Sequence, residues 1–258
     1  MATPKGQFIW HECLTPDVKA ALAFYGHVVG WTSSAMPMQG GGTYFVLEAS
    51  GRGMGGMFEI SKAQQTSGMP PGWVGYISSP DVDGDASRVK KLRGQVHRPP
   101  EDIPDVGRFA PVSDPQGAGF ILFNPKPPPG DPPPPAAGVG AVGWAELYST
   151  DWPKAFAFYS EMFGWKKADA MDMGAMGTYQ LFTSGADPVG GMMNRADPTM
   201  PPHWLYYFNV EGIDAALKRV QAKAGEVQHG PTEVPGGSWI IQCRDPQGAR
   251  FALVAPKR

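Results

Sequence analysis

An internal repeat constrains the fold of this chain more than any other feature of its sequence. Residues 10–31 read WHECLTPDVKAALAFYGHVVGW, and residues 144–165 read WAELYSTDWPKAFAFYSEMFGW. The blocks GTY, GGM, MPPxW and DPQGAxF follow each copy in the same order. Corresponding blocks are 134 residues apart at the start (144 − 10), 135 at GTY and GGM, and 131 at the last two (245 − 114). The 258 residues therefore form two homologous halves with small insertions or deletions between blocks.

Short apolar runs between glycines and prolines indicate that each half has many short strands and two helices. The first helix follows Thr15 or Asp17, either of which can cap it, and ends at Gly30. The second spans residues 83–92, and the later half repeats both helices at 151–163 and 213–224. Strands on either side give a repeated β-α-β-β-β order, so the predicted fold class is α+β.

Composition excludes several kinds of protein. A net charge of −2 leaves no basic surface for nucleic acid, and no apolar run approaches the roughly 20 residues of a membrane span. The N-terminus lacks a hydrophobic signal core, so we expect a cytoplasmic location. Two cysteines without a CxxC pair do not support a disulfide framework. Whether the chain forms a homodimer stays open.

A proline-rich segment separates the halves. Residues 125–135 read PKPPPGDPPPP, which favours an extended polyproline conformation without strand hydrogen bonds. We therefore expect domains at 1–124 and 138–258 joined by a linker at 125–137. A docking segment for a partner protein is the alternative interpretation.

The spaced motifs resemble those of the vicinal oxygen chelate superfamily, which includes glyoxalase I, bleomycin-resistance and fosfomycin-resistance proteins and extradiol dioxygenases. The resemblance rests on the repeated units, the aspartate-led helix ending in FY-x4-GW, and the closing DPxG strand. WHE/WAE, MPPHWLYYF, EDIPDVGRF and SDPQGA are similar to a two-domain subgroup typified by a mycobacterial 27 kDa antigen and hydroxylase-like actinobacterial proteins. The resemblance implies tandem glyoxalase-like domains, with four βαβββ units forming two cup-shaped mixed sheets. It also implies helices on the convex faces and ligand in the concave ones.

The resemblance also implies where a metal would be held. Metal-dependent members take one His, Gln or Glu ligand from each of several cup strands. The matching positions here are Trp10, Phe45, Val74 and Ile121 in the first half and Trp144, Gln180, Leu205 and Ala252 in the second. Only Gln180 has a side chain that can coordinate a metal, and a divalent ion needs several such donors. We therefore expect no metal cofactor.

A shift of two residues along a strand keeps the same face and opens an alternative. This shift makes Glu12, Glu146 and His203 candidate metal ligands. The displaced metal site would lie at His203 and Glu146, and Gln180 could be a further ligand.

Strand alternation predicts which side chains face a bound molecule. They are Trp10, Phe45 and Tyr76 in the first cup, and Trp144, Gln180, His203, Leu205 and Tyr207 in the second. This mixture of aromatic, apolar and a few polar groups is typical of small-molecule pockets. Trp10 and Trp144 either fill the cups or provide stacking platforms.

Glu12 and Glu146 are the catalytic candidates. They occupy matching positions on the inward face, and burial can raise a carboxyl pKa enough for proton transfer. The alternative is a structural carboxylate hydrogen-bonded to a strand end or to Tyr76 or Tyr207. Glu146 ranks first because Gln180 and His203 make the second cup more polar.

Three kinds of function follow. The first is a glyoxalase/bleomycin-resistance-like protein that binds a small, aromatic organic molecule without a metal. The second is a glyoxalase-like lyase, isomerase or dioxygenase-type enzyme that uses Glu146, with Glu12, as acid and base or holds the displaced metal. A third, protein interaction through the proline run, follows from the docking interpretation.

Overall fold

The computed structural model describes residues 4–38, 41–126 and 137–258. The first half forms β1 (Phe8–Thr15), α1 (Val18–Val28), β2 (Thr32–Pro37), β3 (Thr43–Ala49), β4 (Arg52–Glu59), α2 (Lys62–Thr66), β5 (Gly72–Ser78), α3 (Val82–Lys91), β6 (Gln95–Val96), β7 (Glu101–Ile103), β8 (Gly107–Ser113) and β9 (Gly119–Pro125). The second half forms β10 (Val142–Ser149), α4 (Trp152–Phe163), β11 (Lys166–Asp172), η1 (Gly174–Met176), β12 (Thr178–Thr183), β13 (Pro188–Asn194), β14 (His203–Asn209), α5 (Ile213–Ala222), β15 (Glu226–Glu233), β16 (Trp239–Arg244) and β17 (Arg250–Ala255). The predicted linker at 125–137 lies mostly outside the described residues.

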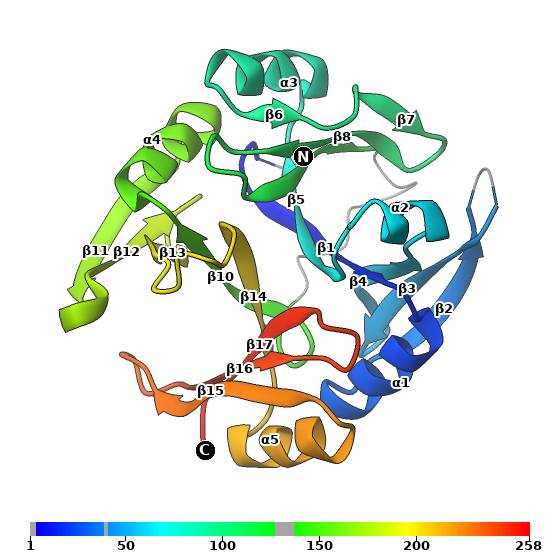
Figure 1. Ribbon diagram of the computed structural model, residues 1–258, viewed down its shortest axis with the longest axis vertical. Helices are drawn as coiled ribbons and strands as arrows, with labels where there is room; N and C mark the ends of the chain where they lie inside the picture. Colours follow the sequence, from blue (N-terminus) through cyan, green and yellow to red (C-terminus); the bar gives the residue numbers. More distant parts are fainter. Residues whose placement is uncertain (1–3, 39–40, 127–136) are drawn as a thin grey trace. The chain divides into compact units, whose positions relative to one another are not determined.

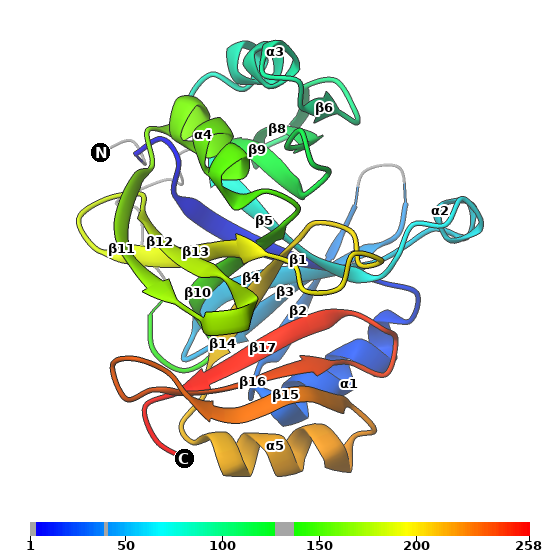
Figure 2. The same ribbon diagram turned by 60° about the vertical axis from the view of Figure 1, so that its left-hand side comes forward.

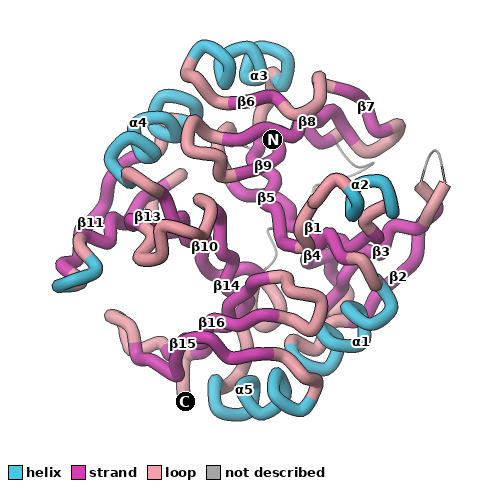
Figure 3. The backbone as a smooth tube through the Cα atoms, in the orientation of Figure 1, coloured by secondary structure: helices cyan, strands magenta, loops and turns pink. Residues whose placement is uncertain are grey.

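The strands form two mixed sheets, which confirms the predicted α+β class (Figures 1 and 3). Strand order is β2-β3-β4-β1-β5-β9-β8-β6 in one sheet, where β7 also pairs with β8, and β11-β12-β13-β10-β14-β17-β16-β15 in the other. In each half the first strand runs parallel to the fourth, as β1 does to β4 and β10 to β13. Each sheet draws its strands from one half only.

The helix boundaries follow the expected capping chemistry. Asp17 caps α1 through Ala20 N (2.9 Å) and Asp151 caps α4 through Lys154 N (3.1 Å). Gly30 follows α1 with φ of 93°. After α3 and α5, the left-handed residues are Arg93 and Ala224, each directly before a glycine. The short elements α2 and β7 were not predicted.

The chain divides into two compact units that do not coincide with the two halves. We call β1–β4 with α1 module 1, β5–β9 with α3 module 2, β10–β13 with α4 module 3, and β14–β17 with α5 module 4. Unit 1 covers residues 1–9, 74–135 and 145–204, and unit 2 covers 10–73, 136–144 and 205–258. Apart from the first residues of β1, β5, β10 and β14, unit 1 therefore holds modules 2 and 3, and unit 2 holds modules 1 and 4.

A buried hydrogen-bond chain lies at the centre of unit 2. Trp73 Nε1 donates to the Tyr25 hydroxyl (2.9 Å), which donates to Asp245 Oδ2 (3.1 Å). The other oxygen of Asp245 accepts the backbone N–H groups of Gln247 and Ala249 (2.9 and 2.8 Å). Burial raises the pKa of Tyr25 well above its usual value, so the hydroxyl stays protonated. Three repeated motifs, FY, MPPGW and DPQG, thus meet at one point.

Unit 1 contains the same chain built from the other copies of these motifs. Trp204 Nε1 donates to the Tyr159 hydroxyl (3.0 Å), which donates to Asp114 Oδ2 (3.3 Å). Asp114 Oδ1 accepts Gln116 N and Ala118 N (2.8 and 3.0 Å). In both units the tyrosine comes from one half of the chain and the aspartate from the other.

Aromatic side chains enclose each hydrogen-bond chain. In unit 2, Phe208 packs edge-on against both Trp31 (4.9 Å) and Trp73 (4.8 Å). In unit 1, Trp165 stacks on Tyr159 (5.0 Å). Within unit 2, α5 covers β15, β16 and β17 and touches α1 (Figure 2). The repeated FY-x4-GW signature therefore marks a packed core in each unit.

We predict that Tyr25→Phe and Tyr159→Phe each lower stability by about 1–3 kcal/mol, because each leaves a buried indole N–H and a carboxylate oxygen without their partner. Thermal unfolding should show a fall of roughly 2–4 °C in Tm per kcal/mol for a protein of this size. A double-mutant cycle that combines Tyr25→Phe with Trp73→Phe serves as the control. Trp73→Phe should cost less in the Tyr25→Phe background than in the native chain, and additive losses would contradict the hydrogen-bond chain.

Candidate functional site

The strand pairing of module 1 separates its side chains onto two faces. Glu12 and Val46 both pair directly with Gly56, and directly opposed residues share a face. Trp10 lies two residues before Glu12 on the same face and is half-buried. The opposite face carries Cys13, fully buried, and His11, which is 7% exposed. Burial lowers the pKa of His11 to about 3, so its imidazole is neutral and belongs to the core.

Three polar groups on the first face form a second hydrogen-bond chain. Trp10 Nε1 donates to the Tyr44 hydroxyl (2.8 Å), and the Tyr44 hydroxyl bonds the Glu12 carboxylate. Burial, followed by the charge and hydrogen bond of Glu12, holds the pKa of Tyr44 far above its usual value. The Tyr44 proton is therefore donated to Glu12, which is itself only 6% exposed. The sequence left a strand end, Tyr76 and Tyr207 open as structural partners of Glu12, and the structure adds Tyr44.

The repeated glycine pair explains how this tyrosine fits. A Cβ atom at Gly55 would lie 2.6 Å from the His11 carbonyl oxygen, and one at Gly56 would overlap the Tyr44 hydroxyl. In module 3 a Cβ at Gly191 would likewise overlap the ring of Tyr179. The GGM block thus brings β4 and β13 against a neighbouring strand on one side and a tyrosine ring on the other.

The predicted facing of Phe45 and Gln180 was wrong. Phe45 pairs with Met57, the neighbour of Gly56, and so lies on the face opposite Glu12. Gln180 pairs with Met192 while Glu146 pairs with Gly191, so these two also lie on opposite faces. Gln180 Nε2 donates to the Ala168 carbonyl (2.8 Å), which is a structural contact. TYFVLEA and TYQLFT are apolar on both faces, so alternation alone could not orient these strands.

Glu146 and its neighbours form the corresponding surface of module 3. Glu146 is 6% exposed and shares a face of β10 with Tyr148. Tyr148 stacks on the His203 ring (5.2 Å between centroids, 15° between planes). His203 Nδ1 lies 2.9 Å from the Pro201 carbonyl oxygen, which requires that this nitrogen carry the proton.

The remaining predicted ligand-facing residues divide between the units. In unit 2, Tyr207 is 3% exposed and its hydroxyl accepts a hydrogen bond from Gln242 Nε2 (2.7 Å), while Leu205 is 4% exposed on the same face. In unit 1, Tyr76 packs edge-on against Phe123 (5.4 Å). Trp144 is half-buried in unit 2.

The residues at the positions that would hold a metal do not fit one. The Trp10 indole has no lone pair for coordination, and its N–H is already bonded to Tyr44. Tyr44 stays protonated, which leaves Glu12 as the one charged oxygen donor of this trio. Across residues 4–38, 41–126 and 137–258, no three His, Cys, Asp or Glu side chains gather closely enough to hold a metal ion. In the same residues, no helix is long and apolar enough to cross a membrane.

Tyr44 and Gln242 are polar residues of these faces that were not predicted from the sequence. Tyr44 belongs to the repeated GTY block, and its recurrence as Tyr179 was the signal that could have identified it. Gln242 carries no such signal, because its role follows from the pairing of β16 with β17, which sets it opposite Ala252.

The sequence matches one family model twice. Residues 10–122 and 141–253 each match the Glyoxalase/Bleomycin resistance protein/Dioxygenase superfamily. The chain is 32% identical over 248 residues to CFP32 of Mycobacterium tuberculosis (strain CDC 1551 / Oshkosh), named as a glyoxylase, covering 96% of this chain and 94% of that one. It is 29% identical over 257 residues to the anthracycline biosynthesis protein DnrV of Streptomyces peucetius, covering 95% and 91%.

Solved structures share the fold at low identity. The 2,3-dioxygenase LapB from Pseudomonas sp. KL28 superposes with a TM-score of 0.67 at 14% identity, covering 98% of this chain and 93% of that one. The Mn(II)-bound glyoxalase from Novosphingobium aromaticivorans also gives 0.67, at 15% identity and with 98% and 83% coverage.

We predict that Gly56→Ala and Gly191→Ala each cost about 1–3 kcal/mol in unfolding free energy, because the added methyl must displace a tyrosine ring. Gly72→Ala and Gly119→Ala are matched strand controls, since a Cβ there meets nothing within 4 Å or nothing nearer than 3.9 Å. Chemical denaturation measures all four. Equal stability of Gly56→Ala and Gly72→Ala would refute the close approach of Tyr44 to β4.

Proposed function

Because the chain belongs to the glyoxalase/bleomycin resistance/dioxygenase superfamily, we propose that it binds a small, planar aromatic molecule without a metal. The binding surface is the face of β1, β3 and β4 that carries Trp10, Tyr44 and Glu12. The single observation that carries this proposal is the hydrogen-bond chain from Trp10 through Tyr44 to Glu12.

The two faces of module 1 differ in a way that suits ligand binding. The core face has Cys13, Leu47 and Met57 at 0–1% exposure. The other face carries half-buried apolar and aromatic groups, namely Trp10, Leu14, Tyr44, Val46 and Phe58. Tyr44 and Phe58 lie roughly parallel (6.3 Å, 26°). Aromatic rings held in a fixed orientation favour stacking with a planar ligand at little further entropic cost.

The polar groups on this face determine which ligands it prefers. Trp10 and Tyr44 hold each other's hydrogen-bonding atoms in place, so neither ring has to reorganise when a ligand arrives. A buried Glu12 carboxylate favours a ligand with a hydroxyl or N–H donor over a purely apolar one. Hydroxylated polycyclic aromatics have both properties. The name of the relative DnrV as an anthracycline biosynthesis protein supports this class of ligand.

The experiment is a fluorescence titration with 1,4-dihydroxyanthraquinone, a planar aromatic with hydroxyl donors. Binding should quench tryptophan emission, and Trp10→Ala should weaken it about tenfold through the loss of roughly 1.4 kcal/mol of stacking. Tyr44→Phe should weaken it less. Trp152→Ala, on α4, is the matched control and should leave the affinity unchanged. Absence of quenching, or the same loss in Trp10→Ala and Trp152→Ala, would count against the proposal.

Glu146 favours a second candidate function, an acid/base enzyme of the glyoxalase type. A carboxylate that is 6% exposed beside Tyr148 on β10 has the restricted solvent contact that acid/base groups use, and the glyoxylase name of CFP32 points the same way.

Turnover of the methylglyoxal–thiol hemithioacetal tests it. For an enzyme of this type we expect Glu146→Gln to lower kcat at least tenfold while Glu12→Gln leaves it near normal. Elemental analysis of the same preparation separates metal-dependent from metal-free turnover. No turnover by the native chain would leave the binding function as the better account.

A further inference from the structure

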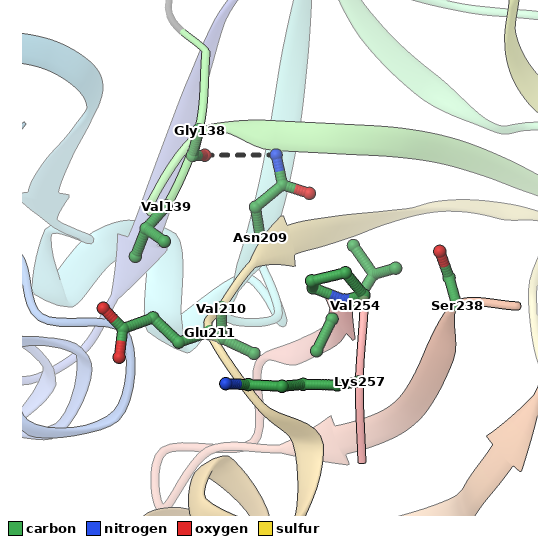
Figure 4. A pocket seen from close by; sticks show the side chains of 10 residues that line it. Gly138, Val139, Asn209, Val210, Glu211, Ser238, Val254 and Lys257 are labelled. Atoms are coloured by element: carbon green, nitrogen blue, oxygen red, sulfur yellow. Dashed lines mark hydrogen bonds between the residues drawn. The ribbon is translucent and has the colours of Figure 1, made fainter.

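A pocket of about 760 Å³ lies in unit 2, and its lining does not include Trp10, Tyr44 or Glu12. It is formed where β14 and β17 end and β16 begins, next to the segment that precedes β10 (Figure 4). Its lining residues are Gly138, Val139, Asn209, Val210, Glu211, Ser238, Val254, Ala255, Pro256 and Lys257. This volume falls within the usual range for small-molecule sites.

Hydrogen bonds fix the walls of this pocket. Asn209 Nδ2 donates to the Gly138 carbonyl (3.1 Å) (Figure 4), and Val210 N donates to the Val254 carbonyl (2.9 Å). Ile213 N donates to the carbonyl of Lys257 (3.1 Å), which ties the end of the chain to the start of α5. The pocket is therefore pre-formed and needs little ordering to accept a ligand.

The internal repeat shows what fills the matching place in unit 1. Gly6 N bonds Ser78 O as Gly140 N bonds Asn209 O, so the two regions correspond. Lys5 then matches Val139, and its ammonium pairs with the buried Asp85 (2.5 Å), which also accepts from Ser79 (2.7 Å).

In unit 2 all three of these positions are apolar. Val139, Val210 and Ala216 stand where unit 1 has Lys5, Ser79 and Asp85. The lysine and its buried acceptor are thus replaced by short apolar side chains, of which Val139 and Val210 line the pocket.

Two opposite charges stand at the rim of the pocket. Lys257 and Glu211 are both exposed, and Figure 4 shows the Lys257 ammonium directed toward the side on which Glu211 lies. Among the described residues, neither side chain forms an ion pair with another side chain. A ligand that matches this arrangement has a cation and an anion close together and an apolar group beside them.

We propose that this pocket binds a free α-amino acid with an apolar side chain. Its carboxylate meets Lys257, its ammonium meets Glu211, and its side chain lies on Val139, Val210 and Val254. The site is separate from the proposed aromatic site, so the Tyr44→Phe variant keeps it.

Calorimetric titration of the full chain with four compounds tests this site. They are L-leucine, 4-methylpentanoate, which lacks the ammonium, 3-methylbutan-1-amine, which lacks the carboxylate, and glycine, which lacks the side chain. L-Leucine should bind most tightly, and loss of either charge should weaken binding roughly two- to fivefold, as expected for exposed ion pairs. Glycine should show no measurable binding.

Variants assign each contact. Lys257→Met should make L-leucine bind no better than 3-methylbutan-1-amine, and Glu211→Gln should make it bind no better than 4-methylpentanoate. Val139→Lys restores the filled arrangement of unit 1 and should abolish binding. Lys218→Met, an exposed change on α5, is the control and should bind like the native chain. No binding of L-leucine at 50 mM, equal affinity for all four compounds, or full binding by Val139→Lys would overturn the proposal.

Discussion

The hydrogen bond between a buried tyrosine and a buried aspartate is the interaction on which each unit of this protein depends. A carboxylate in an aromatic core is costly unless its oxygens are all occupied, and here each aspartate accepts two backbone N–H groups and one hydroxyl. The tyrosine hydroxyl in turn accepts a hydrogen bond from a tryptophan N–H that would otherwise be buried without a partner. Since every member satisfies another, no single motif can change alone. This mutual requirement accounts for the presence of FY, MPPxW and DPQG in both halves.

The outer faces of the sheets depend on that core for their geometry. The packed core fixes the positions of β1 and β4. The glycine pair at 55–56 then leaves room for the Tyr44 ring against β4, and the Tyr44 hydroxyl holds Trp10 and Glu12 in place. Tryptophan stands at the position where the superfamily resemblance implies a metal ligand. This changes which interactions the position can make. An indole stacks and donates one hydrogen bond, whereas an imidazole or carboxylate would coordinate. The fold of the superfamily is kept, and the residues on this face are the basis of the proposed recognition of a flat organic molecule.

Sequence patterns predicted most of the helices and strands and the α+β class, because local signals and the repeat agreed. Asp17 and Asp151 cap their helices, Gly30 follows α1 in the left-handed region, and the β-α-β-β-β order recurs in both sheets. The site was harder to predict. Phe45 and Gln180 were assigned to the wrong face because their strands are apolar on both sides, so only pairing with β4 and β13 decides the orientation. The sequence also did not reveal that Tyr25 bonds Asp245, because the two residues are 220 positions apart and only the folded chain brings them together.

The crossing of halves within each unit has a consequence for how such a chain can arise. A polypeptide of half this length carries one tyrosine motif and one aspartate motif, yet the two belong to different hydrogen-bond chains. Two separate copies would have to associate to complete either chain, each lending one module to the other. Joining the copies turns that encounter into an intramolecular one, with an effective concentration in the millimolar range for a short tether. Gene duplication and fusion would thus remove the concentration dependence of assembly and free each copy to diverge, as Lys5 and Val139 already have.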